Sequence, residues 1–283
     1  MLCFVRDVAS TFTRAIQQFS EGTIDAAQAQ RQHDAYVAAL RQNPHVADVI
    51  HVPADNRFPD CVFIEDTAVY ANGRCVITNP GAESRRGEEA AVRDSIKAAA
   101  PLAAGVTLMA EMHGGATCDG GDVLATDDVM FVGISSRTNM HGFRALASAV
   151  GTHCDAGPDS PSSSPFPAFP ISLPDDSLHL KSVVTSLGPS APYVVADTDA
   201  GERVWEQMAP ALEAIHKPRD VIRVPPVGAN ILRVGATVYY PANVPEMQGH
   251  IEALGLDAAA IDNTEMQKAD GALTCCSVLI PVE

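Results

Sequence analysis

The segment CVFIEDTAVYANGRCVIT, residues 61–78, contains two short apolar runs on either side of a turn signal. Asn72-Gly73 between two such runs is a strong signal for a β-hairpin, because both residues tolerate the positive φ angles of a tight turn. We predict strands at 61–64 and 75–78. Apolar residues at helical spacing follow at 88–98. The segment therefore predicts a hairpin followed by a helix.

The same order recurs along the chain. Further hairpins are predicted at 122–132, 180–195 and 230–240, and further helices at about 141–150, 204–215 and 246–254. The strand Leu2–Val5, a helix carrying Arg6, Asp7 and Arg14, and a C-terminal strand at 270–280 would form a fifth unit. Units of about 57 residues that each expose an apolar face must stack or close into a ring. We predict a single α/β domain over residues 1–283, a propeller-like ring of five pseudo-repeats; the alternative is an α+β domain with coincidentally similar hairpins.

One segment interrupts this order. Asp155–Ser177 carries six prolines interleaved with serines. Proline breaks helices and cannot donate to a sheet ladder, so it is excluded from central strands. We predict an extended surface loop over 155–177; a proline-rich ligand for a partner domain is the alternative.

The composition excludes several classes of function. The chain has 283 residues, a formal net charge of −16 and 46% hydrophobic residues, which is typical of a soluble globular protein. Nucleic-acid binding requires a basic surface, so no such partner is expected. A small cationic substrate suits the acidic chain better. No apolar run reaches the roughly 18 residues of a membrane span, so no membrane partner is expected either.

The cysteines indicate free thiols. There are seven of them, an odd number, and no Cys-x-x-Cys pair occurs. With no secretory segment at the start, a reducing compartment is expected, and the cytoplasm is the predicted location. A zinc site needs closely spaced Cys or His pairs, which the sequence lacks, so neither a metal nor another cofactor is expected.

Polar residues mark the start of each predicted first strand. In chain order they are Asp60, Asp119, His179, Asn230 and Cys275. The first three are spaced 59 and 60 residues apart, as residues at equivalent positions of a repeat should be. In a ring these positions converge on the axis, which would bring together a thiol, an imidazole and carboxylates. That is the composition of a cysteine-dependent catalytic site; a buried, inert Cys275 is the alternative.

Other charged residues indicate the ligand. Glu65 and Asp66 lie in an otherwise apolar predicted strand, 62–69, where two acids are costly unless a cation pairs with them; the alternative is a strand end that emerges into solvent. A planar guanidinium is the natural partner of such carboxylates. Arg85 and Arg137 each precede a predicted helix, where arginine opposes the helix dipole, and they could hold a carboxylate. The predicted ligand is arginine or a close derivative.

At this point the sequence resembles the dimethylarginine dimethylaminohydrolases of the amidinotransferase/deiminase superfamily over essentially its whole length. The matching stretches are 31–33 (RQH), 59–66 (PDCVFIED), 119–124 (DGGDVL), 136–139 (SRTN), 178–182 (LHLKS) and 270–280 (DGALTCCSVLI). Their order and spacing make the resemblance specific. It implies a five-bladed α/β propeller, in agreement with the repeats.

The resemblance also implies roles for individual residues. Cys275 resembles the nucleophile, His179 the general acid and base, and Asp119 the carboxylate that orients the imidazole. Eight further residues resemble the substrate-binding set: Glu65, Asp66 and Asp270 for the guanidinium, Arg85 and Arg137 for the carboxylate, Asp60 and the Ile16 backbone for the α-amino group, and Phe63. Cys276 follows Cys275 in the predicted strand, so it should point to the opposite, packing face.

The implied activity is hydrolysis of Nω-methylated arginine to citrulline and methylamine or dimethylamine through a covalent S-alkylthiouronium. Two alternatives stay open. One is an arginine or agmatine deiminase, although an agmatine site would not need the two arginines. The other is a non-catalytic propeller that acts as a binding protein, such as a ribosome anti-association factor. A homodimer is an open possibility.

Overall fold

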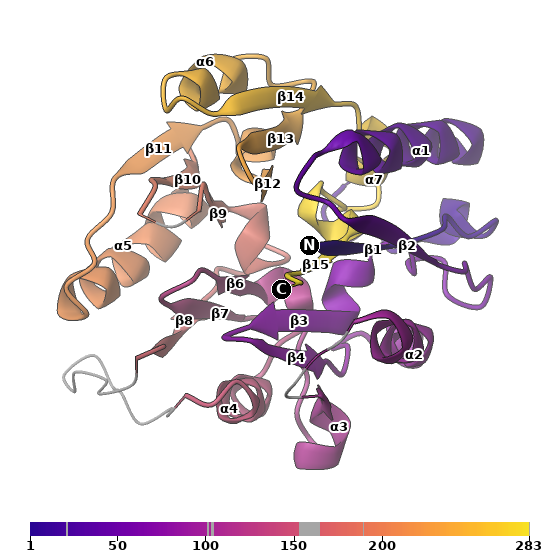
Figure 1. Ribbon diagram of the computed structural model, residues 1–283, viewed down its shortest axis with the longest axis horizontal. Helices are drawn as coiled ribbons and strands as arrows, with labels where there is room; N and C mark the ends of the chain where they lie inside the picture. Colours follow the sequence, from indigo (N-terminus) through magenta and orange to yellow (C-terminus); the bar gives the residue numbers. More distant parts are fainter. Residues whose placement is uncertain (21, 101, 103–104, 153–164, 189, 283) are drawn as a thin grey trace.

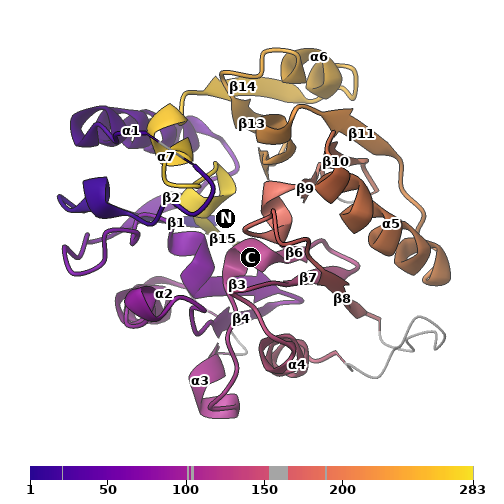
Figure 2. The same ribbon diagram turned by 180° about the vertical axis from the view of Figure 1, so that it is seen from behind.

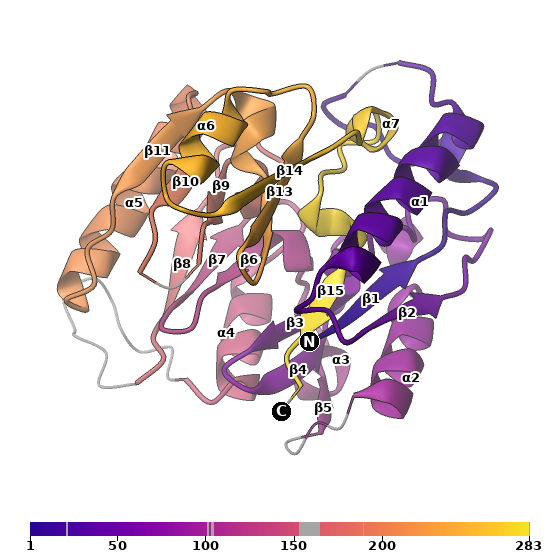
Figure 3. The ribbon, with the colours of Figure 1, turned by 45° about the horizontal axis from the view of Figure 1, so that its top comes forward.

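Five small β-sheets surround a central axis, with helices on the outside of the ring (Figure 1). The computed structural model describes residues 1–283 except 21, 101, 103–104, 153–164, 189 and 283. Both ends of the chain lie near the axis, in front and rear views alike (Figures 1 and 2). The tilted view shows α7 (Thr264–Gln267) at one end of the molecule and the C-terminus at the other (Figure 3). The predicted α/β propeller of five units is confirmed.

Each sheet has three strands with the same topology. In the order inner, middle, outer they are β15 (Val278–Ile280), β1 (Leu2–Arg6), β2 (Asp48–Val52); β3 (Ala68–Ala71), β4 (Arg74–Ile77), β5 (Val106–Leu108); β6 (Val123–Ala125), β7 (Met130–Ile134), β8 (Ala168–Ser172); β9 (Val184–Ser186), β10 (Tyr193–Ala196), β11 (Val221–Val224); and β12 (Leu232–Val234), β13 (Thr237–Pro241), β14 (Asp257–Ile261). The middle strand is antiparallel to the inner strand and parallel to the outer one. The sheet that contains β1 joins both ends of the chain and closes the ring.

A helix connects the middle strand to the outer strand in every unit. These helices are α1 (Ala26–Gln42), α2 (Glu89–Ala99), α4 (Met140–Ala149), α5 (Asp199–Ala214) and α6 (Met247–Glu252). Parallel neighbours need such a crossover, because a tight turn can join only antiparallel strands. A short helix, α3 (Met109–Met112), follows β5. None of the helices in the described ranges is long and apolar enough to span a bilayer.

The predicted Asn72-Gly73 hairpin is confirmed. Ala71 of β3 pairs with Arg74 of β4, which leaves two residues in the turn. Asn72 and Gly73 have φ angles of 49° and 74°, the left-handed values that a two-residue hairpin requires at both positions.

The helices bury one face against the sheets. In α5 the apolar residues Val204, Met208 and Leu212 recur every four positions and lie in one core cluster with Val194 of β10. The Thr198 side chain accepts a hydrogen bond from the Gly201 N–H and caps the start of the helix. The periodic pattern therefore produces both the helix and its packing.

The outer strands were not predicted. They have three to five residues and no turn signal beside them, because each is reached through a helix rather than a hairpin. The predicted strand at 61–64 is also wrong: 3₁₀ helix Ile64–Thr67 precedes β3, which begins at Ala68. The inner strands start later than predicted because such a 3₁₀ turn precedes each of them.

The helix predicted to carry Arg6, Asp7 and Arg14 is wrong. Arg6 ends β1, and only a 3₁₀ turn, Phe12–Arg14, follows it. The first long helix begins at Ala26, where Asp25 accepts hydrogen bonds from the N–H groups of residues 27 and 28. The helix start depends on this cap.

Part of the proline-rich segment is also corrected. Residues 168–172 form β8, an outer strand parallel to β7, rather than a surface loop. Pro170 fits because β8 is an edge strand and the proline side chain is exposed. Phe169 and Ile171 are buried in the core cluster beneath. Residues 153–164 lie outside the described part of the chain.

Candidate active site

Two of the predicted site residues occupy equivalent positions in the fold. Asp119 and His179 immediately precede the 3₁₀ helices Gly120–Asp122 and Leu180–Ser182, which lead into β6 and β9. Both have extended backbone angles. The spacing of 60 residues therefore did identify a shared position.

The other three residues do not share that position. Cys275 lies inside 3₁₀ helix Thr274–Cys276, Asn230 follows its 3₁₀ helix, and Asp60 precedes its own by four residues. The equivalence predicted for all five residues is wrong. The reason is that the turns before the inner strands differ in length, so an even spacing along the chain does not fix the same place in each unit.

A small pocket on the axis collects most of the predicted residues. Its volume is about 30 Å³. It is lined by Ile16, Asp60, Phe63, Asp66, Arg85, Arg137, Leu178, His179, Ala269, Asp270, Gly271 and Cys275. Nine of the eleven predicted residues are among them. Asp119 lies behind His179, and Glu65 faces elsewhere.

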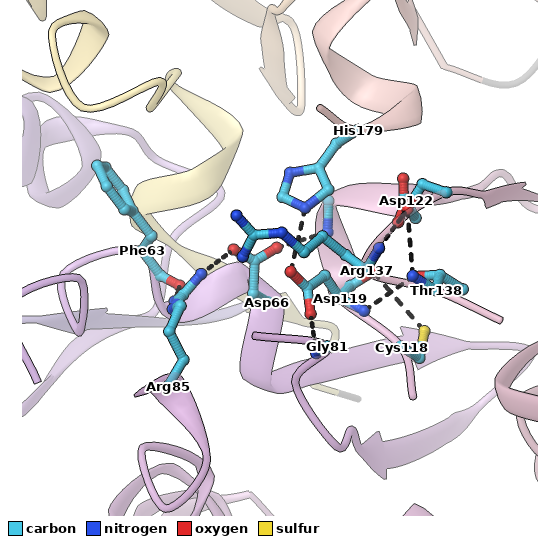
Figure 4. A network of polar contacts seen from close by, with 12 residues as sticks. Phe63, Asp66, Gly81, Arg85, Cys118, Asp119, Asp122, Arg137, Thr138 and His179 are labelled. Carbon is cyan, nitrogen blue, oxygen red and sulfur yellow. Dashed lines mark hydrogen bonds and ion pairs between the residues drawn. The ribbon is translucent and has the colours of Figure 1, made fainter. Parts of the chain in front are cut away.

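Asp119 holds the imidazole of His179. Its Oδ2 lies 3.2 Å from Nε2 of the ring, and its Oδ1 accepts a hydrogen bond of 2.8 Å from the Gly81 N–H (Figure 4). The Asp119 N–H donates to the Thr138 hydroxyl. Asp119 is fully buried and His179 is 6% exposed. Because one ring nitrogen is fixed on the carboxylate, the ring orientation is set and the other nitrogen is left for a ligand.

Electrostatics keep His179 protonated. Burial alone would lower the pKa of His179, but the carboxylates of Asp66, Asp122 and Asp119 more than offset this effect and raise the pKa to about 9. Burial, together with Glu65 and Asp66, raises the pKa of the Cys275 thiol well above its ordinary value. The free protein therefore combines an imidazolium with a neutral thiol near pH 7.

Cys275 and Cys276 face different surroundings, as predicted, but for another reason. They lie in a 3₁₀ helix, not in a strand, so their side chains diverge by about a third of a turn. Cys275 lines the pocket, whereas Cys276 is 4% exposed within an apolar cluster. Two hydrogen bonds hold the turn: the Tyr36 hydroxyl donates to the Leu273 carbonyl, and the Thr274 N–H donates to Oδ1 of Asn230. Because these bonds come from side chains far away in the sequence, residues 274–276 form a 3₁₀ helix although their composition is typical of a strand.

Asp66 is a charged wall of the pocket. Its Oδ2 pairs with Nη1 of Arg85 at 2.6 Å, and its Oδ1 accepts from the Gly121 N–H at 2.9 Å. A Cβ at Gly121 would lie 2.6 Å from the His179 ring and 3.0 Å from Asp66, so only glycine fits there. Although burial opposes ionisation, His179 and Arg85 lower the pKa of Asp66 to about 2. Asp66 is therefore an anion at neutral pH.

Arg85 is more constrained than predicted. It is 4% exposed and also pairs with Glu88 at 2.8 Å and with the Phe63 carbonyl at 3.0 Å. Its guanidinium is therefore largely occupied within the protein. The guanidinium of Arg137 makes one hydrogen bond within the described part of the chain, from Nη2 to Oε1 of Gln18. Arg137 is thus the more available of the two arginines for a ligand carboxylate.

Glu65 points away from the pocket. Successive residues of a 3₁₀ helix diverge, so Glu65 and Asp66 face different cavities. Glu65 pairs with Lys181 and accepts a hydrogen bond of 2.8 Å from the Thr274 hydroxyl. It lines a separate cavity of about 440 Å³. The structure does not bring Glu65 to the place where it was predicted to contact a guanidinium.

The residues around Ile16 cover the pocket. The Ile16 N–H donates to Asp60 at 2.9 Å. Asp270 accepts from the N–H groups of Gln18 and Phe19 at 2.5 and 3.1 Å. The two carboxylates predicted for the substrate therefore hold this segment instead. A ligand the size of arginine requires these contacts to rearrange, because the volume is only about 30 Å³.

Three of the residues in this region could together hold a metal ion. Ligand atoms of Asp66, Asp119 and His179 lie within 4.8 Å of one another. In the structure these side chains instead bond to Arg85, to Gly81 and to each other. In this arrangement Asp66, Asp119 and His179 act as charged and hydrogen-bonding groups.

Asp122 is a site residue that the sequence reasoning missed. It is fully buried, its Oδ1 accepts from the Leu180 N–H at 3.0 Å, and its Oδ2 accepts from the Ser135 hydroxyl at 2.7 Å. Burial raises its pKa to about 6. Because Leu180 follows His179, Asp122 anchors the backbone beside the imidazole. Its carboxylate also places a negative charge near the ring, which helps to raise the pKa of His179. The sequence signal that could have identified Asp122 is its position within the motif at 119–124.

We expect Asp122→Asn to shift the pH profile of activity. The amide can still accept from the Leu180 N–H, but the charge that helps to raise the pKa of His179 is lost. Activity that needs protonated His179 falls as pH rises through a pKa of about 9 in the wild type, so this limb should move down by about one pH unit. The measurement is kcat/KM from pH 6 to 10. Ser135→Ala, which keeps the charge, is the control; an unmoved limb in Asp122→Asn would contradict the assignment.

The fold and the site define a class. A thiol, an imidazole and carboxylates around the axis of a five-bladed α/β propeller are the features of the amidinotransferase/deiminase superfamily. The family model "N,N dimethylarginine dimethylhydrolase, eukaryotic" matches residues 6–154. The chain belongs to the dimethylarginine dimethylaminohydrolase family.

Known proteins support this membership. A dimethylarginine dimethylaminohydrolase of Streptomyces coelicolor is 33% identical over 258 residues, covering 90% of this chain and 87% of the relative. A Pseudomonas aeruginosa enzyme, solved as a cysteine-to-serine mutant complexed with citrulline, has 26% identity, a TM-score of 0.81 and 98% coverage of both chains. A dimethylarginine dimethylaminohydrolase solved as a histidine-to-glycine variant, in an adduct with S-methyl-L-thiocitrulline, has 25% identity, a TM-score of 0.79 and 98% coverage of both chains.

Proposed function

We propose that this protein hydrolyses Nω-methylated L-arginine to citrulline and methylamine or dimethylamine. The observation that carries the proposal is the placement of Cys275, His179 and Asp66 in one small axial pocket that also reaches Arg137. The pocket offers a nucleophile, a proton donor, an anion for a guanidinium and a cation for a carboxylate. These are the groups that a substituted arginine needs.

The roles follow from the contacts. Cys275 is the nucleophile, His179 the acid and base, and Asp119 the group that orients His179. Asp66 would hold the guanidinium and Arg137 the substrate carboxylate. The supporting members are Arg85, which fixes Asp66; Phe63, which lines the pocket; Glu65, which adds negative charge from behind; and Ile16, Asp60 and Asp270, which would exchange their present bonds for the amino-acid end of the substrate.

Substrate binding brings a positive charge close to the Cys275 thiol and so favours its ionisation. Glu65 and Asp66 hold the pKa of the Cys275 thiol up, and a cationic guanidinium beside Asp66 offsets this field. The thiol then gives up its proton to solvent, and the thiolate attacks the guanidinium carbon and forms a tetrahedral adduct. Protonated His179 gives its proton to the departing amine, and an S-alkylthiouronium remains on Cys275.

A water molecule completes the reaction. Neutral His179 removes a proton from the water, which attacks the thiouronium carbon. The C–S bond breaks, citrulline leaves, and Cys275 and His179 return to their starting forms. One water is consumed and one amine is released per turnover. The steps use only side chains and water.

A turnover assay tests the function. Citrulline release should be observed from asymmetric dimethylarginine and monomethylarginine, with a much lower rate from arginine. Agmatine, which lacks the carboxylate for Arg137, should give its ureido product, N-carbamoylputrescine, at a much lower rate as well. Preference for unmethylated arginine would overturn the methylarginine assignment, and no ureido product from any of the four would overturn the enzyme assignment. Arg137→Gln should raise KM for dimethylarginine and leave agmatine unaffected.

The cysteines bear on the location of the protein. The six described cysteines are all unpaired, which supports the proposed cytoplasmic location. The homodimer stays a prediction.

A further inference from the structure

A second, larger cavity adjoins the candidate active site. Its volume is about 350 Å³, against about 30 Å³ for the pocket that holds Cys275. The two share Leu178, Asp270 and Gly271 as a common wall. The remaining walls come mainly from the fourth and fifth units of the ring, together with residues around Phe19 and α7.

The cavity has the character of a ligand site. Its lining is mostly apolar, and Phe19 and Val227 at its surface are 46% and 40% exposed. Asn263, only 5% exposed, contributes an Nδ2 group that has no hydrogen-bond partner, and the Ser177 hydroxyl in the same lining has none either. A buried donor without a partner destabilises the folded protein, because it has lost its hydrogen bonds to water. Such groups are expected where a bound molecule completes the hydrogen bonds.

The position of His179 identifies the part of the substrate that meets this cavity. The departing nitrogen receives its proton from His179, so it must lie against the imidazole. Leu178, the residue before His179, faces both cavities. Gly271 adds no side chain to the shared wall, and the Phe63 ring packs against it, since a Cβ there would lie 2.2 Å from that ring. The substituents of the departing nitrogen therefore lie near Leu178, which lines both cavities.

We propose that the second cavity receives N-substituents larger than methyl, so that the substrate class extends to arginines carrying a linear alkyl group of three or more carbons on the departing nitrogen. This inference rests on the proposed function. Methyl groups fit in the small pocket, whereas a propyl tail passes Leu178 and lies among apolar side chains of the second cavity. A tail that ends in an oxygen acceptor also meets Asn263.

The reaction balances in the same way as with methylated arginine. The Cys275 sulfur forms a bond to the guanidinium carbon, and the bond from that carbon to the propyl-bearing nitrogen breaks. Propylamine leaves with the proton of His179, and one water hydrolyses the thiouronium. Nω-propyl-L-arginine and water give citrulline and propylamine.

Kinetics on the full-length protein test the proposal. We expect Nω-propyl-L-arginine to be hydrolysed with kcat/KM within about tenfold of that for asymmetric dimethylarginine. Val227→Trp, at an exposed position of the cavity, should lower kcat/KM for the propyl substrate at least tenfold and change dimethylarginine less than twofold. Leu254→Trp is the matched control, because Leu254 is 41% exposed and not part of the cavity lining; it should change neither.

The outcomes separate the two claims. Turnover of dimethylarginine without turnover of the propyl substrate overturns the inference and leaves the proposed function intact. Equal loss for both substrates in Val227→Trp, with Leu254→Trp unaffected, also overturns it. A wild-type protein that hydrolyses neither substrate contradicts the proposed function and this inference with it. Leu178→Ala, which thins the wall, should raise the ratio of propyl to dimethyl kcat/KM.

Discussion

Cys275→Ser is expected to reduce citrulline release by more than about 10⁴-fold. The site already holds the pKa of the thiol well above its ordinary value through burial, Glu65 and Asp66. A serine hydroxyl is far less acidic than a thiol, so the same field leaves almost no alkoxide to attack the guanidinium carbon. Binding should survive, because the guanidinium and carboxylate partners are unchanged. Calorimetry with citrulline on the variant measures this directly.

Cys276→Ser is the matched control one residue away. Its Sγ is packed in an apolar cluster and approaches the Ala272 carbonyl at 3.6 Å. We expect turnover within a few-fold of the wild type and a loss of about 1–2 kcal/mol in the free energy of unfolding, because a hydroxyl replaces a buried thiol. A folded Cys276→Ser protein without activity would show that the two thiols have been assigned to the wrong faces.

The repeating hairpins could be predicted from the sequence because their signals are local. Asn72-Gly73 encodes a two-residue turn through backbone conformation alone, and the apolar spacing of α5 encodes its buried face. The outer strands carry no comparable signal. β5 has three residues, and the strand it pairs with, β4, is reached across a helix. Such a pairing exists only once the ring has formed.

The site shows the same division. Asp119 and His179 could be placed together because the chain repeats the same turn before β6 and β9. The direction of Glu65 could not be predicted, since it depends on the rotation of one residue in a 3₁₀ helix. The contacts of Gln18 with Asp270 and Arg137 join residues more than 100 positions apart with no motif at Gln18. Contacts between residues so far apart in the chain depend on the completed fold, so no local sequence pattern predicts them.

His179→Gly should separate the two halves of the reaction. Without the imidazole no group donates a proton to dimethylamine, so turnover of dimethylarginine should fall by about 10³-fold or more. S-methyl-L-thiocitrulline differs because methanethiolate leaves without a proton. Its carbon can therefore be attacked by Cys275 in the variant, whereas the later attack by water still lacks its base. The covalent intermediate should accumulate, in line with the adduct solved for the histidine-to-glycine relative.

Intact-protein mass spectrometry measures this outcome. After incubation of His179→Gly with S-methyl-L-thiocitrulline at about pH 9, where more of the thiol ionises, the chain should gain the mass of the analogue less methanethiol. The double variant with Cys275→Ser should gain nothing. Modification of the double variant would identify a different nucleophile. Undiminished turnover of dimethylarginine by His179→Gly would instead show that another group transfers the proton. The two readouts therefore test the nucleophile and the acid independently, although both side chains line the same small pocket.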